Sequence, residues 1–186
     1  MTTFLTALVV VVGIVGVLNL LLTFGVIRRL KEYDQAIAKI PHGAMHSVPS
    51  EAMRAPGSEV DEFTAVSTDG VPVTKESLHA QTLVGFFSVG CAPCTESAPK
   101  FAAHAVGVPG GKDSVLAIVV ADGDDDPSEL AGILGEGARV GVEGYDGPIA
   151  TAFGVTAFPT YGVVAGGRIT ATSLDFTVLP PIPTPV

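Results

Sequence analysis

The chain has 186 residues, of which 47% are hydrophobic, and its mean hydropathy is +0.50. This length suits one globular domain with additional segments. The net charge is −9, and from residue 41 onward there are six basic and seventeen acidic residues, which argues against nucleic acid and anionic lipid as partners.

The hydrophobic excess lies at the N-terminus, where residues 3–27 include no charged side chain over 25 positions. As a helix this segment would measure about 37 Å, more than the ~30 Å hydrocarbon core of a bilayer. We therefore predict a transmembrane helix over 3–27. A cleavable signal peptide fits less well, because a basic leading region and a small-residue cleavage site are missing. A buried core helix is the other alternative.

Four further segments follow from spacing and composition. The spacing of Leu30, Tyr33 and Ile37 predicts that the helix continues as a juxtamembrane stalk over 28–40. The remaining predicted segments are a linker over 41–57, a globular domain over 58–175 and a Pro-rich tail over 176–186.

Within the domain, apolar strand-like runs alternate with helical stretches, which predicts an α/β fold. The predicted elements, in chain order, are a hairpin over 63–73 with Asp69-Gly70 at its turn, a buried strand over 82–88, a helix over 91–104, a strand over 114–121, a helix with Asp126 as N-cap and Pro127 at its first position, a short helix over 148–153, and strands over 161–165 and 168–173.

The only two cysteines, Cys91 and Cys94, lie in a Cys-Ala-Pro-Cys run directly after the buried strand. Two intervening residues let one helical turn bring both sulfurs within bonding reach. At a helix start, the free backbone N–H groups and the helix dipole favour the Cys91 thiolate. The pair therefore predicts a reversible dithiol/disulfide couple, with a static disulfide or inert thiols as the alternative.

A second motif, Ala-Phe-Pro-Thr-Tyr, places Pro159 65 residues after Cys94. Together with Cys-Ala-Pro-Cys it resembles the thioredoxin superfamily. The resemblance implies a thioredoxin-like fold, with a central mixed sheet flanked by helices, and a cis-proline at Pro159 opposite the cysteines. It also implies that the backbone of Phe158 pairs with a substrate strand. On this resemblance the residues that shape the substrate site are Ala92, Pro93, Phe158, Pro159 and Thr160.

The run from Phe63 through Asp69-Gly70 to the cysteines is similar to membrane-anchored TlpA/ResA-type thiol–disulfide oxidoreductases. The N-terminal layout is similar to the methylamine-utilisation accessory protein D group. These resemblances imply an enzyme that exchanges disulfides with exported proteins, in the reducing direction, through catalytic Cys91 and Cys94. Its partners would be protein disulfides or thiols and a membrane or soluble thiol electron donor, with no cofactor and no metal.

Several positions depart from the superfamily pattern. Gly90 stands where a tryptophan usually precedes the first cysteine, Gly85 where thioredoxin has a buried acid, and Ser97 where some ResA-like proteins have a glutamate. The sequence therefore identifies no proton acceptor for Cys94, and Glu96 is only a candidate.

Two other functions remain open. A copper-handling protein of the Sco kind would use Cys-x-x-x-Cys with a distal histidine, and the spacing here is one residue short. A redox-inactive interaction module of the same fold is the second alternative. The aspartates from Asp122 to Asp126 indicate a capped helix start rather than a calcium loop, since no bidentate glutamate follows at the spacing required.

Membrane topology gives two conflicting indications. Arg28, Arg29 and Lys31 follow the predicted transmembrane helix, and the positive-inside rule would place them, and the domain, in the cytoplasm. The resemblance places the domain outside. We expect an extracytoplasmic domain, because disulfides persist in oxidising compartments.

Overall fold

The computed structural model describes residues 52–78 and 81–182. The predicted transmembrane helix, the stalk and the linker up to residue 51 lie outside the described residues. Within the described ranges, no helix is both long and apolar enough to cross a membrane.

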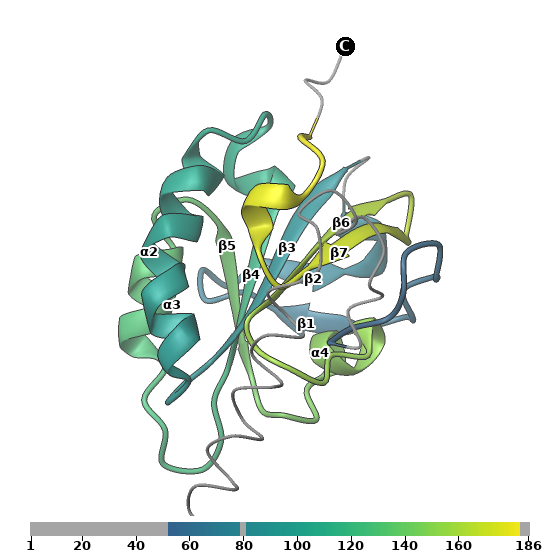
Figure 1. Ribbon diagram of the computed structural model, residues 1–186. Coiled ribbons are helices and arrows are strands. Elements are labelled where there is room, and N and C mark those ends of the chain that lie inside the picture. Colours follow the sequence, from purple (N-terminus) through teal and green to yellow (C-terminus); the bar gives the residue numbers. More distant parts are fainter. Residues whose placement is uncertain (1–51, 79–80, 183–186) are drawn as a thin grey trace, which may run out of the picture. The chain divides into compact units, whose positions relative to one another are not determined.

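Five strands form the main sheet, in the spatial order β5-β4-β3-β6-β7. The first three run parallel to one another, whereas β6 and β7 are antiparallel to their neighbours (Figure 1). The strands are β3 (Thr82–Ser88), β4 (Val115–Val120), β5 (Arg139–Glu143), β6 (Thr160–Ala165) and β7 (Arg168–Ser173). A separate antiparallel hairpin consists of β1 (Thr64–Val66) and β2 (Pro72–Thr74).

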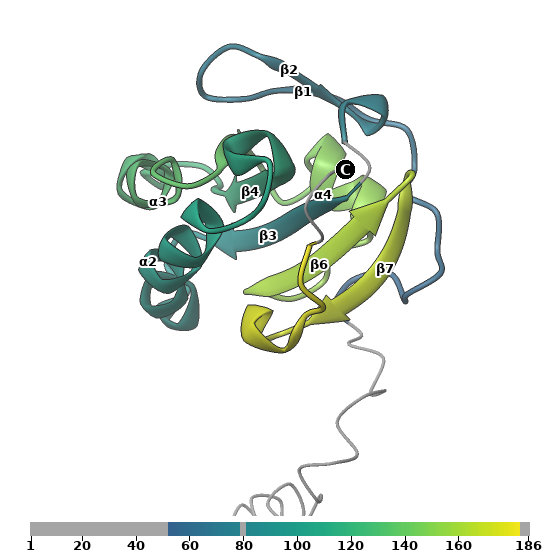
Figure 2. The same ribbon diagram turned by 90° about the horizontal axis from the view of Figure 1, so that it is seen from above.

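Helices cover both faces of the sheet. The helices α2 (Ala92–Val106) and α3 (Ser128–Leu134) pack on one face, and α4 (Pro148–Phe153) packs on the other together with the hairpin (Figures 1 and 2). Short 3-10 turns occur at η1 (Lys75–Ser77), η2 (Gly111–Ser114) and η3 (Phe176–Val178).

Strand β3 lies in the middle of the sheet, between β4 and β6, and it is buried on both faces along its whole length. Its side chains alternate between the two cores: Leu83 and Phe87 face α2, whereas Val84 and Phe86 face α4. Such a doubly buried strand needs a continuous apolar sequence, which is why the run over 82–88 could be recognised.

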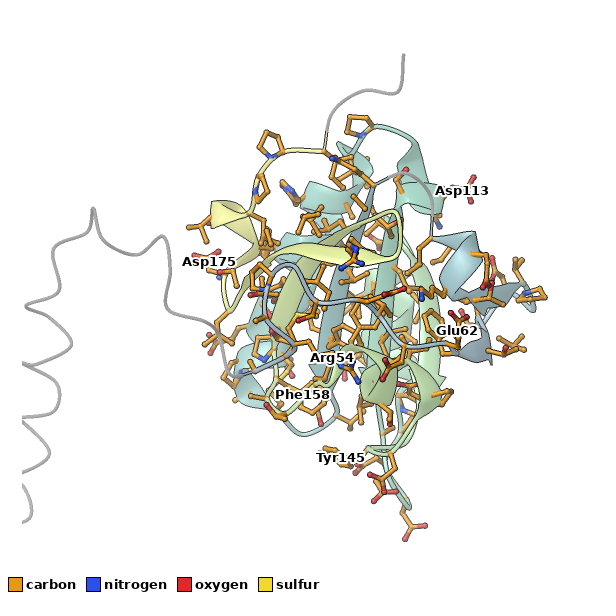
Figure 3. The ribbon with its side chains drawn as sticks, turned by 90° about the vertical axis from the view of Figure 1, so that its right-hand side faces the viewer. Arg54, Glu62, Asp113, Tyr145, Phe158 and Asp175 are labelled. Carbon is orange, nitrogen blue, oxygen red and sulfur yellow. A yellow bond between two sulfur atoms is a disulfide. The ribbon has the colours of Figure 1, made fainter. Side chains whose placement is uncertain are left out.

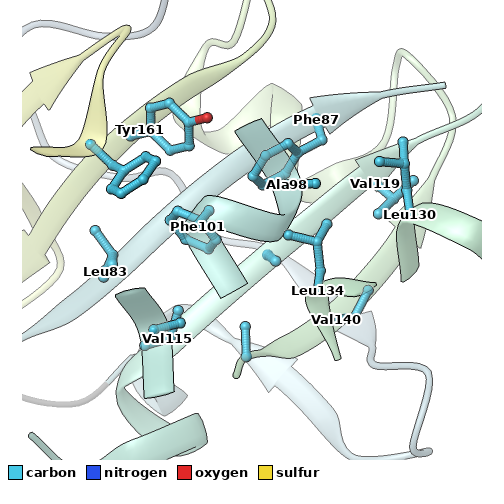
Figure 4. Close-up of a cluster of buried hydrophobic side chains, with 14 of the residues drawn as sticks. Leu83, Phe87, Ala98, Phe101, Val115, Val119, Leu130, Leu134, Val140 and Tyr161 are labelled. Carbon is cyan, nitrogen blue, oxygen red and sulfur yellow. The ribbon is translucent and has the colours of Figure 1, made fainter. Parts of the chain in front are cut away.

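An aromatic cluster fills the core beneath α2 (Figure 4). The Phe101 ring stacks on Tyr161, with centroids 5.4 Å apart, and meets the edge of Phe87 at 5.4 Å and of Phe176 at 5.6 Å. Each such pair contributes roughly 0.5–1.5 kcal/mol beyond its buried area. Phe101 approaches the backbone of Gly85 so closely that a Cβ there would lie 2.9 Å from its Cζ.

The structure confirms the predicted hairpin, helices and strands over these residues, and differs at two places. Helix α3 begins at Ser128, one residue after the predicted start, although the Asp126 carboxylate still accepts the Ser128 N–H. Strand β5 was not predicted, because the short sequence Arg-Val-Gly-Val-Glu has no apolar run.

The folded region extends past the predicted domain bounds of 58–175 at both ends. Met53, assigned to the linker, is buried in the core beneath α4, and its sulfur would lie 3.3 Å from a Cβ at Gly162. Phe176, assigned to the Pro-rich tail, is buried against α2 and opens η3. In both cases an apolar side chain outside the predicted domain bounds completes a core.

Candidate redox site

The turn after β3 places the two cysteines at the start of α2. Gly90 has a φ of 75°, a left-handed conformation that glycine adopts without strain, and it turns the chain from the strand into the helix. Cys91 is the N-cap residue of α2. The backbone conformation thus gives a physical reason for glycine at position 90.

Cys91 and Cys94 form a disulfide, with their Cα atoms 5.2 Å apart. The two sulfurs differ in their surroundings. Cys91 is partly exposed and its Sγ accepts the Cys94 N–H at 3.3 Å, whereas Cys94 is fully buried and its Sγ accepts the Ser88 N–H at 3.4 Å. A partner molecule can therefore reach Cys91 and not Cys94. Backbone N–H donors at a helix N-terminus also favour the thiolate form when the pair is reduced.

The loop before β6 lies against Cys91. The Phe158–Pro159 peptide bond is cis, and the Phe158 carbonyl oxygen lies 3.8 Å from the Cys91 sulfur. Both residues are half-buried. Thr160 is fully buried and pairs with Phe86 of β3, so it lies within the sheet.

Ala92 and Pro93 are exposed in the first turn of α2, beside Cys91. The structure thus brings the predicted site residues together, apart from the buried Thr160. Their roles toward a substrate remain predictions.

The sequence has no acid at Gly85 or Ser97, the two positions where the thioredoxin resemblance would place one. Phe101 occupies the space next to Gly85. Ser97 Oγ donates to the Cys94 carbonyl at 3.2 Å. The Tyr161 phenol is buried, and within the described residues its oxygen has no hydrogen bond of ordinary geometry. Burial raises the pKa of Tyr161, and the nearby Ser97 hydroxyl partly offsets this effect.

Sequence reasoning missed Tyr145, which lies next to Ser88 at the end of β3. The Ser88 hydroxyl lies 2.9 Å from the Tyr145 hydroxyl, and the Tyr145 ring meets the Phe158 ring edge-on with centroids 6.0 Å apart. Figure 3 shows Tyr145 and Phe158 at the same end of the domain. Tyr145 follows β5, so it could not be placed without that strand. A tyrosine within a Gly-Tyr-Asp-Gly loop was the available signal.

Potential metal ligands do not gather in the described part of the chain. No group of three or more histidine, cysteine, aspartate or glutamate side chains could hold an ion there. The Asp125 carboxylate accepts the Asp122 N–H, and Asp126 accepts the Ser128 N–H. Of the histidines, His104 is described, and its ring packs 5.3 Å from that of Phe176.

No family model and no curated protein matches the chain. Solved structures do resemble it. A putative protein disulfide isomerase from Bacteroides thetaiotaomicron is 18% identical and has a TM-score of 0.50, covering 63% of this chain and 77% of that chain. The thioredoxin domain of a thiol-disulfide oxidoreductase from Bacteroides vulgatus is 19% identical, with a TM-score of 0.48 over 65% of this chain and 89% of that chain. A thio-disulfide isomerase from Thermus thermophilus is 22% identical, with a TM-score of 0.46 over 64% and 86%.

The first of these likenesses, at a TM-score of 0.50, supports the fold of this chain. The fold is therefore thioredoxin-like, as predicted. At these identities the likeness concerns the fold alone.

Proposed function

We propose that this protein is a membrane-anchored thiol–disulfide oxidoreductase that exchanges disulfides with exported proteins. One observation carries the proposal: a bonded cysteine pair at a helix N-terminus has one sulfur open to a partner and the other buried. A purely structural disulfide gains nothing from this asymmetry, whereas disulfide exchange requires one reachable and one protected sulfur.

The reaction proceeds in two thiol–disulfide exchange steps. The Cys91 thiolate attacks one sulfur of the partner disulfide, the partner S–S bond breaks, and the other partner sulfur leaves as a thiolate with the bonding electron pair. The Cys94 thiolate then attacks Cys91 Sγ and displaces the second partner thiolate. Two electrons pass to the partner, its two thiolates take protons from water, and Cys91–Cys94 is left oxidised. The reverse sequence oxidises a dithiol partner.

The geometry assists each step. The Cys94 N–H and the helix dipole stabilise the Cys91 thiolate, and the Ser88 N–H does the same for Cys94 as it becomes nucleophilic. We assign the reducing direction on the resemblance to ResA-type proteins, with a membrane or soluble thiol as electron donor. No contact within the described residues favours the copper-handling alternative.

A trapping experiment tests the reaction. A Cys94→Ala variant cannot complete the second step, so it should accumulate a mixed disulfide between Cys91 and a polypeptide partner that dithiothreitol releases. The matched Cys91→Ala variant should trap nothing, because Cys94 is buried. Absence of any thiol-sensitive adduct in Cys94→Ala would contradict the proposal.

The membrane anchor and the extracytoplasmic location are separate parts of the proposal. They rest on the uncharged segment over 3–27 and on the need for a compartment in which disulfides persist. In intact cells, a membrane-impermeant thiol reagent should label Cys91 after mild reduction. Labelling that appears only after lysis would place the domain in the cytoplasm.

A further inference from the structure

Exposed acidic side chains lie at the edge of the sheet where the Cys91 sulfur can be reached. Strands β3, β4 and β5 end together at this edge. The Val89 N–H donates to the Val120 carbonyl at 2.9 Å, and the Ala121 N–H donates to the Glu143 carbonyl at 2.9 Å. The segment that leaves β3 carries Cys91, and the segments that leave β4 and β5 carry five exposed aspartates. We call these aspartates the acidic rim: Asp122, Asp124, Asp125, Asp126 and Asp146.

No basic side chain compensates the charge of the acidic rim. Within residues 52–78 and 81–182, none of the five aspartates forms an ion pair. Five of the six lysine and arginine side chains in these ranges bond to groups outside the rim: Arg54, Lys75, Lys112, Arg139 and Arg168. The sixth, Lys100, lies in α2 and follows Cys91 at about 13 Å along the helix axis. The negative field of the rim is therefore uncompensated near Cys91.

An aromatic ring in the loop that carries Asp146 is a second feature that favours a cation. Tyr145 directly precedes Asp146 and is 52% exposed. Its hydroxyl lies 2.9 Å from Ser88 Oγ, so the ring is held beside the end of β3. The face of an aromatic ring attracts an ammonium or guanidinium group. A carboxylate next to an exposed aromatic face therefore suits a lysine or arginine side chain better than an acidic one.

We propose that the acidic rim and Tyr145 select polypeptide partners that carry lysine or arginine beside the disulfide presented to Cys91. This inference rests on the proposed function and names its substrate class. Neighbouring strands are ~4.8 Å apart, less than the Debye length of ~8 Å at physiological ionic strength, so the field of the rim reaches the segment that carries Cys91. A negative potential speeds the encounter with a cationic partner and opposes the encounter with an anionic one.

The test compares three synthetic peptides, each with one internal disulfide, that differ only in having lysine, glutamine or glutamate beside both cysteines. The full chain is reduced in advance, and its second-order rate constant with each peptide is measured by acid quench and alkylation. Each rate constant is divided by that of the same peptide with dithiothreitol, which is uncharged. The lysine peptide should react about tenfold or more faster than the glutamate peptide at low ionic strength, and at most about twofold faster in 0.5 M salt.

Two double variants with the same change in net charge separate the rim from the overall charge of the protein. Asp124→Asn with Asp146→Asn removes two rim charges whose side chains make no hydrogen bond or ion pair within the described residues. It should reduce the preference for lysine about threefold or more at low ionic strength. Asp113→Asn with Glu136→Gln is the matched control. Figure 3 shows Asp113 at the end of the domain opposite Tyr145, and Glu136 follows Gly135, which Lys112 contacts there.

The control should keep the full preference, and both double variants should react with the glutamine peptide as fast as the wild type does. Tyr145→Leu, which keeps an apolar side chain, should also lower the preference for lysine. Equal normalised rates for the lysine and glutamate peptides, a preference that does not depend on salt, or a control that loses as much as the rim variant would overturn this inference alone. A wild type that reduces none of the three peptides would overturn the proposed function and this inference with it.

Discussion

Replacing Gly85 with alanine would place a methyl group against an aromatic ring that cannot move. The new Cβ would lie 2.9 Å from Phe101 Cζ and 3.0 Å from Phe87 Cε2. Phe101 is fully buried and is held between Tyr161 and Phe176, with ring centroids 5.4 and 5.6 Å away. Overpacking of this kind costs about 1–3 kcal/mol.

Alanine also brings a gain, because glycine in a strand is less favourable by roughly 0.5–1 kcal/mol. The steric cost exceeds this gain, so we expect Gly85→Ala to lower the free energy of unfolding by about 1–2 kcal/mol. Pulse proteolysis in urea would measure the shift in the unfolding midpoint.

Gly132→Ala is the matched control. Gly132 lies in α3, and a Cβ there would have no atom within 4 Å. This variant should gain roughly 0.5–1 kcal/mol. The cost of Gly85→Ala should be smaller when it is measured in a Phe101→Leu background, because the smaller side chain frees the space. A Gly85→Ala variant as stable as Gly132→Ala would refute the reasoning, because the ring would then have moved without cost.

Three further changes test the packing and the buried polar groups. Phe176→Ala should lower the free energy of unfolding by about 3 kcal/mol, because its ring packs on Phe101 and Tyr161. A loss below about 1 kcal/mol in urea unfolding would contradict this contribution of the Phe176 ring to stability. Tyr161→Phe should be neutral or stabilising by about 1 kcal/mol at neutral pH, since the buried hydroxyl has no hydrogen-bond partner of ordinary geometry within the described residues. Because burial raises the pKa of Tyr161, the wild type should lose stability more steeply than the variant above about pH 10, and parallel alkaline profiles would contradict this. Burial raises the pKa of Glu143, so its contribution to stability should decrease as pH rises above the pKa of the unfolded chain. The stability difference between wild type and Glu143→Gln should therefore fall as pH rises from about 4, and a constant difference would count against it.

Local signals in the sequence were sufficient to predict the centre of the fold. Strand β3 is one unbroken apolar run, and Cys91 with Pro93 opens a helix in the ordinary way. The asymmetry of the two cysteines follows from the same helix start, because Cys91 as N-cap faces outward while Cys94 lies one turn inside.

Features that depend on distant contacts could not be predicted. Strand β5 has Gly141 at its middle because a Cβ there would lie 2.9 Å from Ile118 Cδ1, so close packing removes the apolar pattern that marks a strand. Without β5, the loop that places Tyr145 next to Ser88 and Phe158 has no known position.

The burial of Phe176, in the predicted Pro-rich tail, is a second feature that could not be predicted from the sequence. Phe176 is a single aromatic residue near a Pro-rich segment, and its burial depends on Phe101, which lies far away in the sequence.

The most direct measurement is an equilibrium redox titration of the full chain in glutathione or dithiothreitol buffers, with the free thiols of Cys91 and Cys94 counted by alkylation and mass spectrometry. The account predicts one reversible two-electron couple, with a midpoint between about −270 mV, typical of a reductant, and about −120 mV, typical of an oxidant. Thiols that stay reduced throughout, or a disulfide that resists every buffer, would contradict the claim that this pair exchanges disulfides.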